Sequence, residues 1–336
     1  MSSMLPGSML LTGIFLHFIP MKRRSVLKNL AAAAAWAPVS SLAAGWPKPE
    51  AIPAADKPAI CIFSKHLQFL DYEAAAETAV EIGFDGVDLA VRPRGHVLPQ
   101  HVERDLPKAV EAMKKAGLTV PMMTTAITSV DSPHTQGILE TAAGLGIGYY
   151  RMGYYRYDKN RPMQAVMDEF QRQGTALAAL NEKLNITACY QNHAGARYVG
   201  APIWDLGMML RQIDSAYLGC QYDIRHATVE GGQAWPLGLE YIYPYIHNIV
   251  VKDFHWAQDE AGKWYVKNVP VGAGMVDFAQ FLSLLKAKGF EGPISLHVEY
   301  KFHEQDEPVA STRQKAVETM KRDVQALRTL LQAAGW

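Results

Sequence analysis

After residue 57 the chain repeats one pattern eight times: a short apolar run of strand character is followed by a longer segment with helical periodicity. The strand-like runs are 58–63, 85–90, 119–125, 148–153, 186–191, 218–223, 248–253 and 293–299. The helical segments lie near 70–82, 103–116, 134–145, 162–184, 202–213, 235–245, 275–289 and 309–334. Eight such units over residues 58–336 match the size of a single-domain α/β protein with a (β/α)8 TIM barrel.

A doubly wound sheet is the alternative to the barrel. Such sheets usually carry a Gly-rich phosphate-binding turn after the first strand, whereas here the first strand leads into Ser64-Lys-His-Leu-Gln68. The sequence also holds no GxGxxG, GKS, GKT or HExxH motif. The barrel is therefore the better prediction.

The segment from Met21 to Gly45 has the pattern of an export signal. Its basic start, Met21-Lys-Arg-Arg-Ser-Val-Leu-Lys28, is followed by five alanines and a small-residue exit. The paired arginines resemble a twin-arginine signal, which implies export of a folded protein to the periplasm or beyond. We expect translation to begin at Met21 and cleavage to follow Ala43 or Ala44. An amphipathic N-terminal helix is the alternative.

This pattern divides the chain into residues 1–44, an upstream extension plus signal peptide, residues 45–57, a linker, and residues 58–336, the barrel. The apolar run within 7–20 is too short for a membrane span. We therefore expect no stable membrane span after signal removal.

The charge balance argues against a nucleic-acid partner. The whole chain has 33 basic and 33 acidic residues, but the first 44 residues hold four basic residues and no acidic one. The remainder carries 29 basic and 33 acidic residues, a net charge of −4, which would repel a phosphate backbone. The three cysteines lie in apolar runs and form no zinc motif, so we expect buried thiols.

Polar residues gather at the C-terminal ends of the predicted strands. In a barrel these ends converge on one mouth, where active sites form. In chain order they are Ser64, Lys65, His66, Asp88, Arg92, Arg94, His96, Thr124, Thr125, Arg151, Tyr154, Tyr155, Gln191, Asn192, His193, Asp223, Arg225, His226, Lys252, Asp253, His255, His297 and Glu299. Six of the eleven histidines are in this set, which core packing does not explain.

Four of these segments resemble the xylose isomerase-like TIM barrels, the sugar phosphate isomerase/epimerase family. Gln221-Tyr-Asp-Ile-Arg-His226 resembles the family's Asp-x-x-His after strand 6, and Ile294-Ser-Leu-His-Val-Glu299 resembles the strand that delivers the last metal-binding glutamate. Tyr190-Gln-Asn-His-Ala-Gly195 and Val251-Lys-Asp253 resemble the segments of strands 5 and 7. The resemblance runs from residue 58 to the end. It extends to an exported branch of the family through Val91-Arg-Pro-Arg-Gly-His96 and Gly272-Ala-Gly-Met-Val-Asp277.

The resemblance implies one divalent ion (Mn, Mg, Co or Zn) in the mouth, held by Glu, Asp, His and Glu of strands 5 to 8. Asp223 and Glu299 match this pattern, whereas Gln191 and Val250 replace the first glutamate and the histidine. A glutamine carbonyl can bind a hard ion, so we predict Asp223, Glu299 and Gln191 as ligands, with His255 supplying a loop nitrogen. As alternatives, Asp223 caps a helix or pairs with Arg225, Glu299 pairs with Lys252 or His297, and His255 contacts substrate or solvent.

In the family's epimerases two carboxylates remove and return the proton next to a carbonyl, while the metal stabilises the enediolate. Gln191 has no proton affinity near neutral pH, so proton abstraction is expected to rest on Glu299, His193 or His226. Aldose–ketose isomerisation and β-elimination from a keto-sugar both remain open. Without a metal, Lys252 can stabilise the enediolate; its structural alternative is an ion pair with Asp253 or Glu299.

The sequence thus predicts a metal-assisted sugar isomerase or epimerase, with a keto-sugar lyase or hydrolase and a non-catalytic sugar-binding barrel as alternatives. A nuclease on the same barrel would need a basic face and more metal ligands. We expect the aromatic segment 254–274 to be a lid or an oligomer contact, and the chain to form a homo-oligomer. The expected contacts to a small carbohydrate are Lys65, His66, Arg92, His96, Arg151, Asn192, Arg225, His297 and Trp256.

Overall fold

The computed structural model describes residues 57–336. The predicted signal peptide, its start at Met21 and all but the end of the predicted linker lie outside the described residues. Within 57–336, none of the helices combines the length and the apolar character that crossing a membrane requires.

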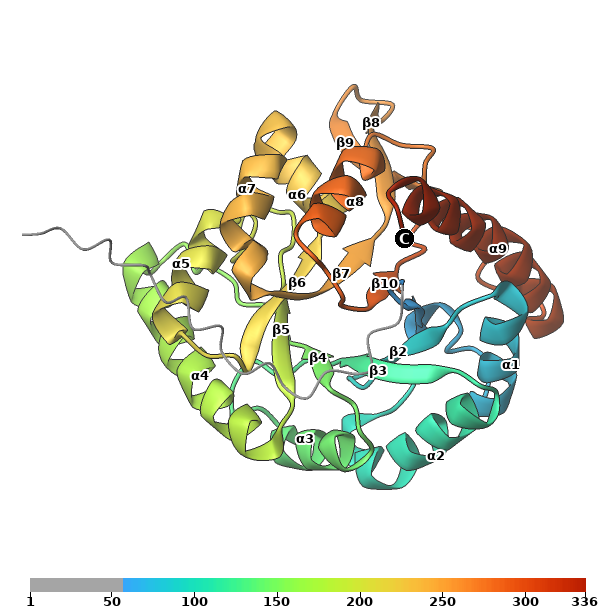
Figure 1. Cartoon of the computed structure of the whole chain (residues 1–336), viewed down its shortest axis with the longest axis horizontal. Helices are drawn as coiled ribbons and strands as arrows, with labels where there is room; N and C mark the ends of the chain where they lie inside the picture. The colour runs from blue at the N-terminus through green and yellow to red at the C-terminus, as the bar shows by residue number, and fades with distance from the viewer. Residues whose placement is uncertain (1–56) are drawn as a thin grey trace, which may run out of the picture. The chain divides into compact units, whose positions relative to one another are not determined.

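The eight parallel strands close into a barrel, as predicted (Figure 1). Around the barrel their order is β1, β10, β7, β6, β5, β4, β3 and β2. Each barrel strand therefore pairs with the barrel strands that precede and follow it in the chain, and the last, β10, pairs with the first, β1. The strands are β1 Ile60–Phe63, β2 Gly86–Ala90, β3 Thr119–Thr124, β4 Tyr149–Arg151, β5 Thr187–Gln191, β6 Leu218–Asp223, β7 Ile246–Val251 and β10 Ile294–Leu296. Their apolar side chains are almost all buried, which is why they read as continuous hydrophobic runs.

Helices surround the barrel, and the core lies between the strands and these helices (Figure 1). The α-helices are α1 Tyr72–Ile82, α2 Val102–Lys115, α3 Thr135–Gly144, α4 Met163–Leu184, α5 Trp204–Ile213, α6 Ile224–Gly231, α7 Trp235–Ile242, α8 Phe278–Ala287 and α9 Val309–Ala333. The eight predicted helices are present, whereas the eight-residue α6 directly after β6 was not predicted. Short 3-10 helices occupy Ser64–His66, Pro99–His101, Gly232–Ala234 and Tyr243–Tyr245.

Local sequence explains the ends of several helices. Asp71 begins α1 by accepting a hydrogen bond from the backbone N–H of Ala74 (2.8 Å), and Gly83 ends it in the left-handed region at φ 103°. Asp277 caps α8 in the same way as Asp71. Asp223, the last residue of β6, caps α6 and so belongs to both a strand and a helix start.

An antiparallel hairpin, β8 Asp253–Gln258 and β9 Trp264–Val269, stands outside the barrel sheet (Figure 1). It occupies most of the segment expected to be a lid or an oligomer contact. The predicted strand 248–253 therefore divides: β7 ends at Val251, Lys252 lies between the strands, and Asp253 opens the hairpin. Lys252 consequently sits at the mouth, next to an ordered hairpin.

Asp253 anchors this hairpin instead of entering the site. Its buried carboxylate accepts hydrogen bonds from the backbone N–H groups of Phe254, Gly272, Gly274 and Val276, at 2.8 to 3.2 Å. A Cβ on Gly274 would lie 2.2 Å from the Asp253 carboxylate, so this position must be glycine. The Asp253 and Gly272–Val276 parts of the recognised motifs therefore hold the loop rather than contact a ligand.

Candidate active site

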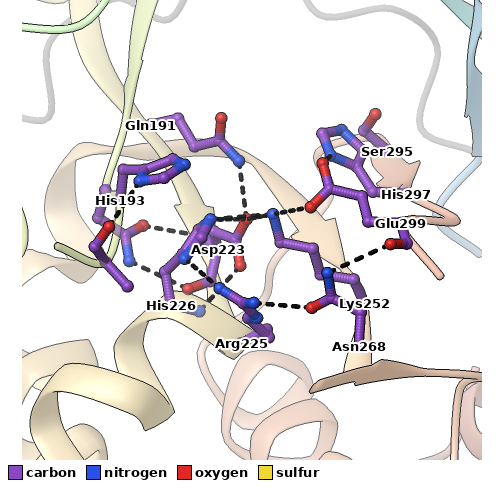
Figure 2. Close-up of polar contacts among 12 residues, drawn as sticks. Gln191, His193, Asp223, Arg225, His226, Lys252, Asn268, Ser295, His297 and Glu299 are labelled. Atoms are coloured by element: carbon purple, nitrogen blue, oxygen red, sulfur yellow. Dashed lines mark hydrogen bonds and ion pairs between the residues drawn. The ribbon is translucent and has the colours of Figure 1, made fainter. Parts of the chain in front are cut away.

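The ammonium group of Lys252 lies between two carboxylates at the mouth of the barrel (Figure 2). Its Nζ is 3.1 Å from Oδ2 of Asp223 and 3.3 Å from Oε2 of Glu299. Lys252 is 3% exposed and Asp223 is fully buried, whereas the Glu299 side chain is 26% exposed. The two predicted metal-binding carboxylates thus meet around one cation, which is the lysine.

Several backbone contacts fix Asp223 at this point. Its Oδ1 accepts the N–H of His226 (3.1 Å) as the cap of α6, while Asn192 holds its main chain from both sides. The Asn192 amide oxygen accepts the N–H of Asp223 (2.7 Å), and its amide nitrogen donates to the carbonyl of Asp223 (3.0 Å). Asp223 is therefore both helix cap and ion-pair partner. Asn192, expected to contact substrate, uses its amide to position this aspartate.

Electrostatics keep the central group charged. Burial lowers the pKa of Lys252, but the carboxylates of Asp223 and Glu299 outweigh it and raise the pKa above the ordinary value. Burial raises the pKa of Glu299, but Lys252 and His297 hold it well below its usual range. Lys252 is thus an ammonium and Glu299 a carboxylate across the physiological pH range.

His226 lies between two cations. Its Nε2 is 2.9 Å from the Lys252 ammonium, and its Nδ1 is 2.9 Å from the Arg225 guanidinium. Burial, followed by the charges of Lys252, His193 and Arg225, holds the pKa of His226 well below its ordinary value. A neutral imidazole has one lone pair, and both neighbours can only donate, so only one contact is a hydrogen bond in either tautomer. These surroundings do not suit the predicted role of His226 as a general base.

His193 has a nitrogen free for chemistry. Its Nδ1 lies 2.8 Å from the carbonyl of Ala194, which can only accept, so Nδ1 carries the proton and Nε2 the lone pair. The half-buried ring lies 4.0 Å from the His226 ring between centroids. Burial, opposed by the Ala194 hydrogen bond, lowers its pKa. In Figure 2, His193 and Glu299 lie on opposite sides of Asp223 and Lys252.

Gln191 connects this cluster to Arg151. Its amide nitrogen donates to Oδ2 of Asp223 (2.7 Å), and its oxygen accepts from Tyr154 (2.5 Å) and Arg151 (3.2 Å). The amide orientation is fixed because a carboxylate only accepts and a guanidinium only donates. Tyr154 was not in the predicted site set, although its place just after β4 marked it as a mouth residue.

The donor set does not fit a divalent ion. The Gln191 oxygen is engaged with Arg151 and Tyr154, and the amide turns its nitrogen toward Asp223. Val250, in register with Asp223 and Ser295 on the neighbouring strands, has no ligand atom. The Lys252 ammonium already lies within 3.3 Å of both carboxylates and would repel a second cation.

His255 does not complete a metal site either. It lies on the β8–β9 hairpin opposite Lys267. Within residues 57–336, no three His, Cys, Asp or Glu side chains gather closely enough to hold a metal ion. Asp223 and Glu299 thus meet as predicted, but Lys252 lies between them, the Gln191 oxygen is engaged by Arg151 and Tyr154, and His255 lies on the hairpin.

A cavity of about 640 Å³ opens beside Glu299. It is lined by Lys65, His66, Gln68, Phe69, Asn268, Val298, Glu299, Tyr300, Lys301, Phe302 and His303. Next to Glu299, neither ring nitrogen of buried His297 has a hydrogen-bond partner among residues 57–336; its Nδ1 is 3.8 Å from Oε1 of Glu299. A cavity beside unpaired polar groups is the expected shape of a small-molecule site.

Asn268 on the hairpin was missed by the sequence analysis. Its amide oxygen accepts from Arg225 (2.7 Å), and its amide nitrogen donates to the carbonyl of Glu299 (3.3 Å). The hairpin thus closes one wall of the site. No local motif marks this residue, because only the folding back of the hairpin brings it to Arg225.

Three residues that were predicted to contact substrate lie outside the cavity or are engaged in structural hydrogen bonds. His96 places Nε2 3.1 Å from the carbonyl of Leu70 and so joins two loops. Trp256 lies on the hairpin, 43% exposed, outside the cavity lining. His66 lines the cavity, but its Nε2 accepts the N–H of Val298 (3.1 Å) and holds the segment after β10.

The fold and site together define a class: a closed (β/α)8 barrel whose strand ends carry a buried acid–base cluster and a small-molecule cavity. The chain belongs to the xylose isomerase-like TIM barrel family, whose model matches residues 76–330. This confirms the family resemblance found in the sequence. None of the curated proteins matches the chain.

Several solved structures share this fold. A xylose isomerase-like TIM barrel protein from Mycobacterium smegmatis, in complex with magnesium, is 14% identical with a TM-score of 0.59, over 82% of this chain and 98% of that one. An L-ribulose 3-epimerase is 13% identical (TM-score 0.62; 83% and 96% covered). A 3-keto-D-glucoside 4-epimerase from E. coli is 14% identical (TM-score 0.57; 78% and 99% covered).

Proposed function

We propose that this protein is a sugar isomerase or epimerase-like enzyme, which moves a proton next to the carbonyl of a sugar or keto-sugar. The observation that carries the proposal is the buried Lys252 ammonium between Asp223 and Glu299, with the lone pair of His193 nearby. Two of the similar structures are sugar epimerases by name, which supports a carbohydrate substrate.

In this mechanism His193 is the base. Its Nε2 takes the proton from the carbon next to the carbonyl, and the C–H electrons move onto the carbonyl oxygen. The Lys252 ammonium stabilises the resulting enediolate by charge and hydrogen bonding in a water-poor site. For isomerisation, His193 returns the proton to the former carbonyl carbon, while the hydroxyl proton of the adjacent carbon passes to the former carbonyl oxygen and leaves the new carbonyl group. In the lyase reaction the proton stays on His193 and the enediolate expels a leaving group from its β-carbon.

Lys252 takes the role that we first expected of a metal ion. Asp223 and Glu299 hold the lysine side chain in place and keep it protonated, since both raise its pKa. Because the donor set does not fit a divalent ion, no step is assigned to one. Glu299, with its pKa held low, is a weaker base than His193 and positions Lys252.

Proton exchange tests this proposal directly. The purified chain is incubated in D2O with a panel of aldoses, ketoses and keto-sugars, and NMR follows deuterium uptake next to the carbonyl. We expect uptake for at least one sugar, and the variant His193→Gln to slow it about 100-fold. His101→Gln, a change on an exposed 3-10 helix, is the matched control.

Two results would contradict parts of the proposal. Binding of a sugar without any exchange would favour the non-catalytic sugar-binding barrel. Unchanged exchange in His193→Gln would move the base to Glu299.

A further inference from the structure

Two arginines at the mouth lack acidic partners. Arg151 ends β4 and is 7% exposed, and half-buried Arg92 follows β2. Neither guanidinium forms an ion pair with any of the residues that the structure describes. Buried charges in proteins are normally paired, so this region of the mouth has an unmatched positive charge.

Within residues 57–336, the hydrogen-bond acceptors of the Arg151 guanidinium are neutral oxygens, and the guanidinium also lies 4.7 Å from the centroid of the Tyr154 ring. It donates to Tyr154 (2.5 Å), to the Gln191 amide oxygen (3.2 Å) and to the carbonyl of Thr125 (3.4 Å). Its Nε is buried and has no hydrogen-bond partner. These contacts orient the guanidinium but leave its charge uncompensated.

Arg92 lies near Arg151 and adds a second positive charge. Burial, followed by the charge of Arg151, lowers the pKa of Arg92. Its guanidinium lies 5.4 Å from the centroid of the Phe63 ring, which stacks on His297 beside Glu299. Its Nε is also buried without a partner.

A carboxyl group on the same strand does not satisfy these arginines. Asp88, in β2, is fully buried and accepts hydrogen bonds from Thr124 (2.9 Å) and Ser295 (2.7 Å). Burial raises its pKa, which weakens it further as a counter-charge. Asp88 acts on both guanidinium groups through its charge, but within residues 57–336 it forms no ion pair with either of them.

We propose that Arg92 and Arg151 form an anion subsite and that the substrate is a sugar acid, whose carboxylate binds there. The reaction part of this inference rests on the proposed function; the binding part does not. Only Gln191 and Asp223 separate Arg151 from Lys252, so a carboxylate in the subsite belongs to the same small molecule whose carbonyl meets Lys252.

A carboxylate suits this subsite better than a phosphate group. A planar guanidinium matches the two oxygens of a carboxylate in a fork. Phosphate sites commonly add the free backbone N–H groups of a helix start. After Arg151 no α-helix begins until Met163, and after Arg92 none begins until Val102.

Binding of matched sugar pairs to the full-length chain tests the subsite. Calorimetry compares D-glucuronate with D-glucose, D-galacturonate with D-galactose and 2-keto-D-gluconate with D-fructose, with D-glucose 6-phosphate as the phosphate arm. We expect at least one acid to bind about tenfold more tightly than its neutral partner, and Arg92→Gln to abolish this preference. Arg104→Gln, an exposed arginine paired with Asp105 on α2, is the matched control and should keep it.

Several outcomes overturn the inference. These are equal binding of acid and neutral partner in every pair, an acid preference that survives Arg92→Gln, and tighter binding of the phosphate than of every acid. Each is independent of the proton-exchange result: a protein that prefers acids but exchanges no proton keeps the subsite and loses the proposed reaction.

Discussion

The two sides of the barrel mouth differ in whether their cationic side chains are paired with carboxylates. On the side of β6, β7 and β10, the Lys252 ammonium is enclosed by Asp223 and Glu299. On the side of β2 and β4, Arg92 and Arg151 form no ion pair with a carboxylate of residues 57–336. The paired side has fixed protonation states and suits chemistry, whereas the unpaired side retains charge with which to bind an anion. The difference separates the proposed reacting centre from the proposed binding determinant at the mouth of one barrel.

Breaking the paired side should have the largest effect. In Lys252→Met the carboxylates lose their shared cation, and we expect proton exchange to fall about 1000-fold, as for the loss of an electrostatic transition-state contact. The free energy of unfolding should fall by about 3 kcal/mol, because buried Asp223 loses its counter-charge.

Proton exchange and urea denaturation measure these two effects. Lys115→Met, which removes an exposed lysine paired with Glu111, is the control. Exchange at the wild-type rate in Lys252→Met would show that this lysine is only structural.

His66, in the cavity lining, should make the stability of the fold sensitive to acid. Burial and the nearby His297 lower the pKa of His66 to about 3. In the unfolded chain His66 therefore takes up a proton near pH 6.5, whereas in the folded chain it stays neutral until about pH 3. Stability contributed by neutral His66 should be lost as the pH falls through this window, by up to about 1.4 kcal/mol per pH unit.

Denaturation at several pH values tests this assignment. His66→Gln, whose amide oxygen can still accept the Val298 N–H, should show a flatter acid limb than the wild type. Identical slopes in the two proteins would assign the acid sensitivity to other groups.

Removing a charge from the unpaired side should cost little. In Arg92→Gln we expect the free energy of unfolding to change by less than about 0.5 kcal/mol, since lost contact with Phe63 is offset by reduced repulsion from Arg151. Thermal and urea denaturation without ligand measure the change. A loss comparable to that of Lys252→Met would reveal a counter-charge and remove the contrast between the two sides.

Chelation should have no effect at all. Because Lys252 occupies the position between the carboxylates, dialysis against EDTA is expected to leave both proton exchange and melting temperature unchanged. Added Mn²⁺, Mg²⁺, Co²⁺ or Zn²⁺ should not raise the melting temperature. A rate lost on chelation and restored by one of these ions would mean that Lys252 moves aside to admit a metal.

The location of the site followed from the sequence, but its bonding did not. The rule that polar residues at strand ends meet at the mouth located Gln191, Asp223, Lys252 and Glu299 correctly. It could not say that the Gln191 amide turns its nitrogen to Asp223, because Arg151 and Tyr154 force that orientation from another strand. Twin-arginine export and a homo-oligomer remain predictions.

The same limit applies to α6 and the β8–β9 hairpin. Eight residues after β6 are too few to show helical periodicity, and Asp223 caps the helix while also pairing with Lys252. The hairpin depends on Asp253 collecting backbone N–H groups from residues about twenty positions away. A short stretch of sequence therefore shows neither the helix α6 nor the hairpin.

By itself, the sequence predicted the barrel, because alternating strand and helix patterns are local and eight of them, without a Gly-rich turn after the first strand, match the size of a barrel. It also indicated most of the residues that reach the mouth, since strand ends converge there in such barrels, but it placed Asp253 there although this residue anchors the hairpin. The tertiary structure alone decided which charges are paired and which are not. Pairing depends on distances between side chains on strands far apart in the chain, and such distances place the Lys252 ammonium between the two carboxylates that were expected to hold a metal.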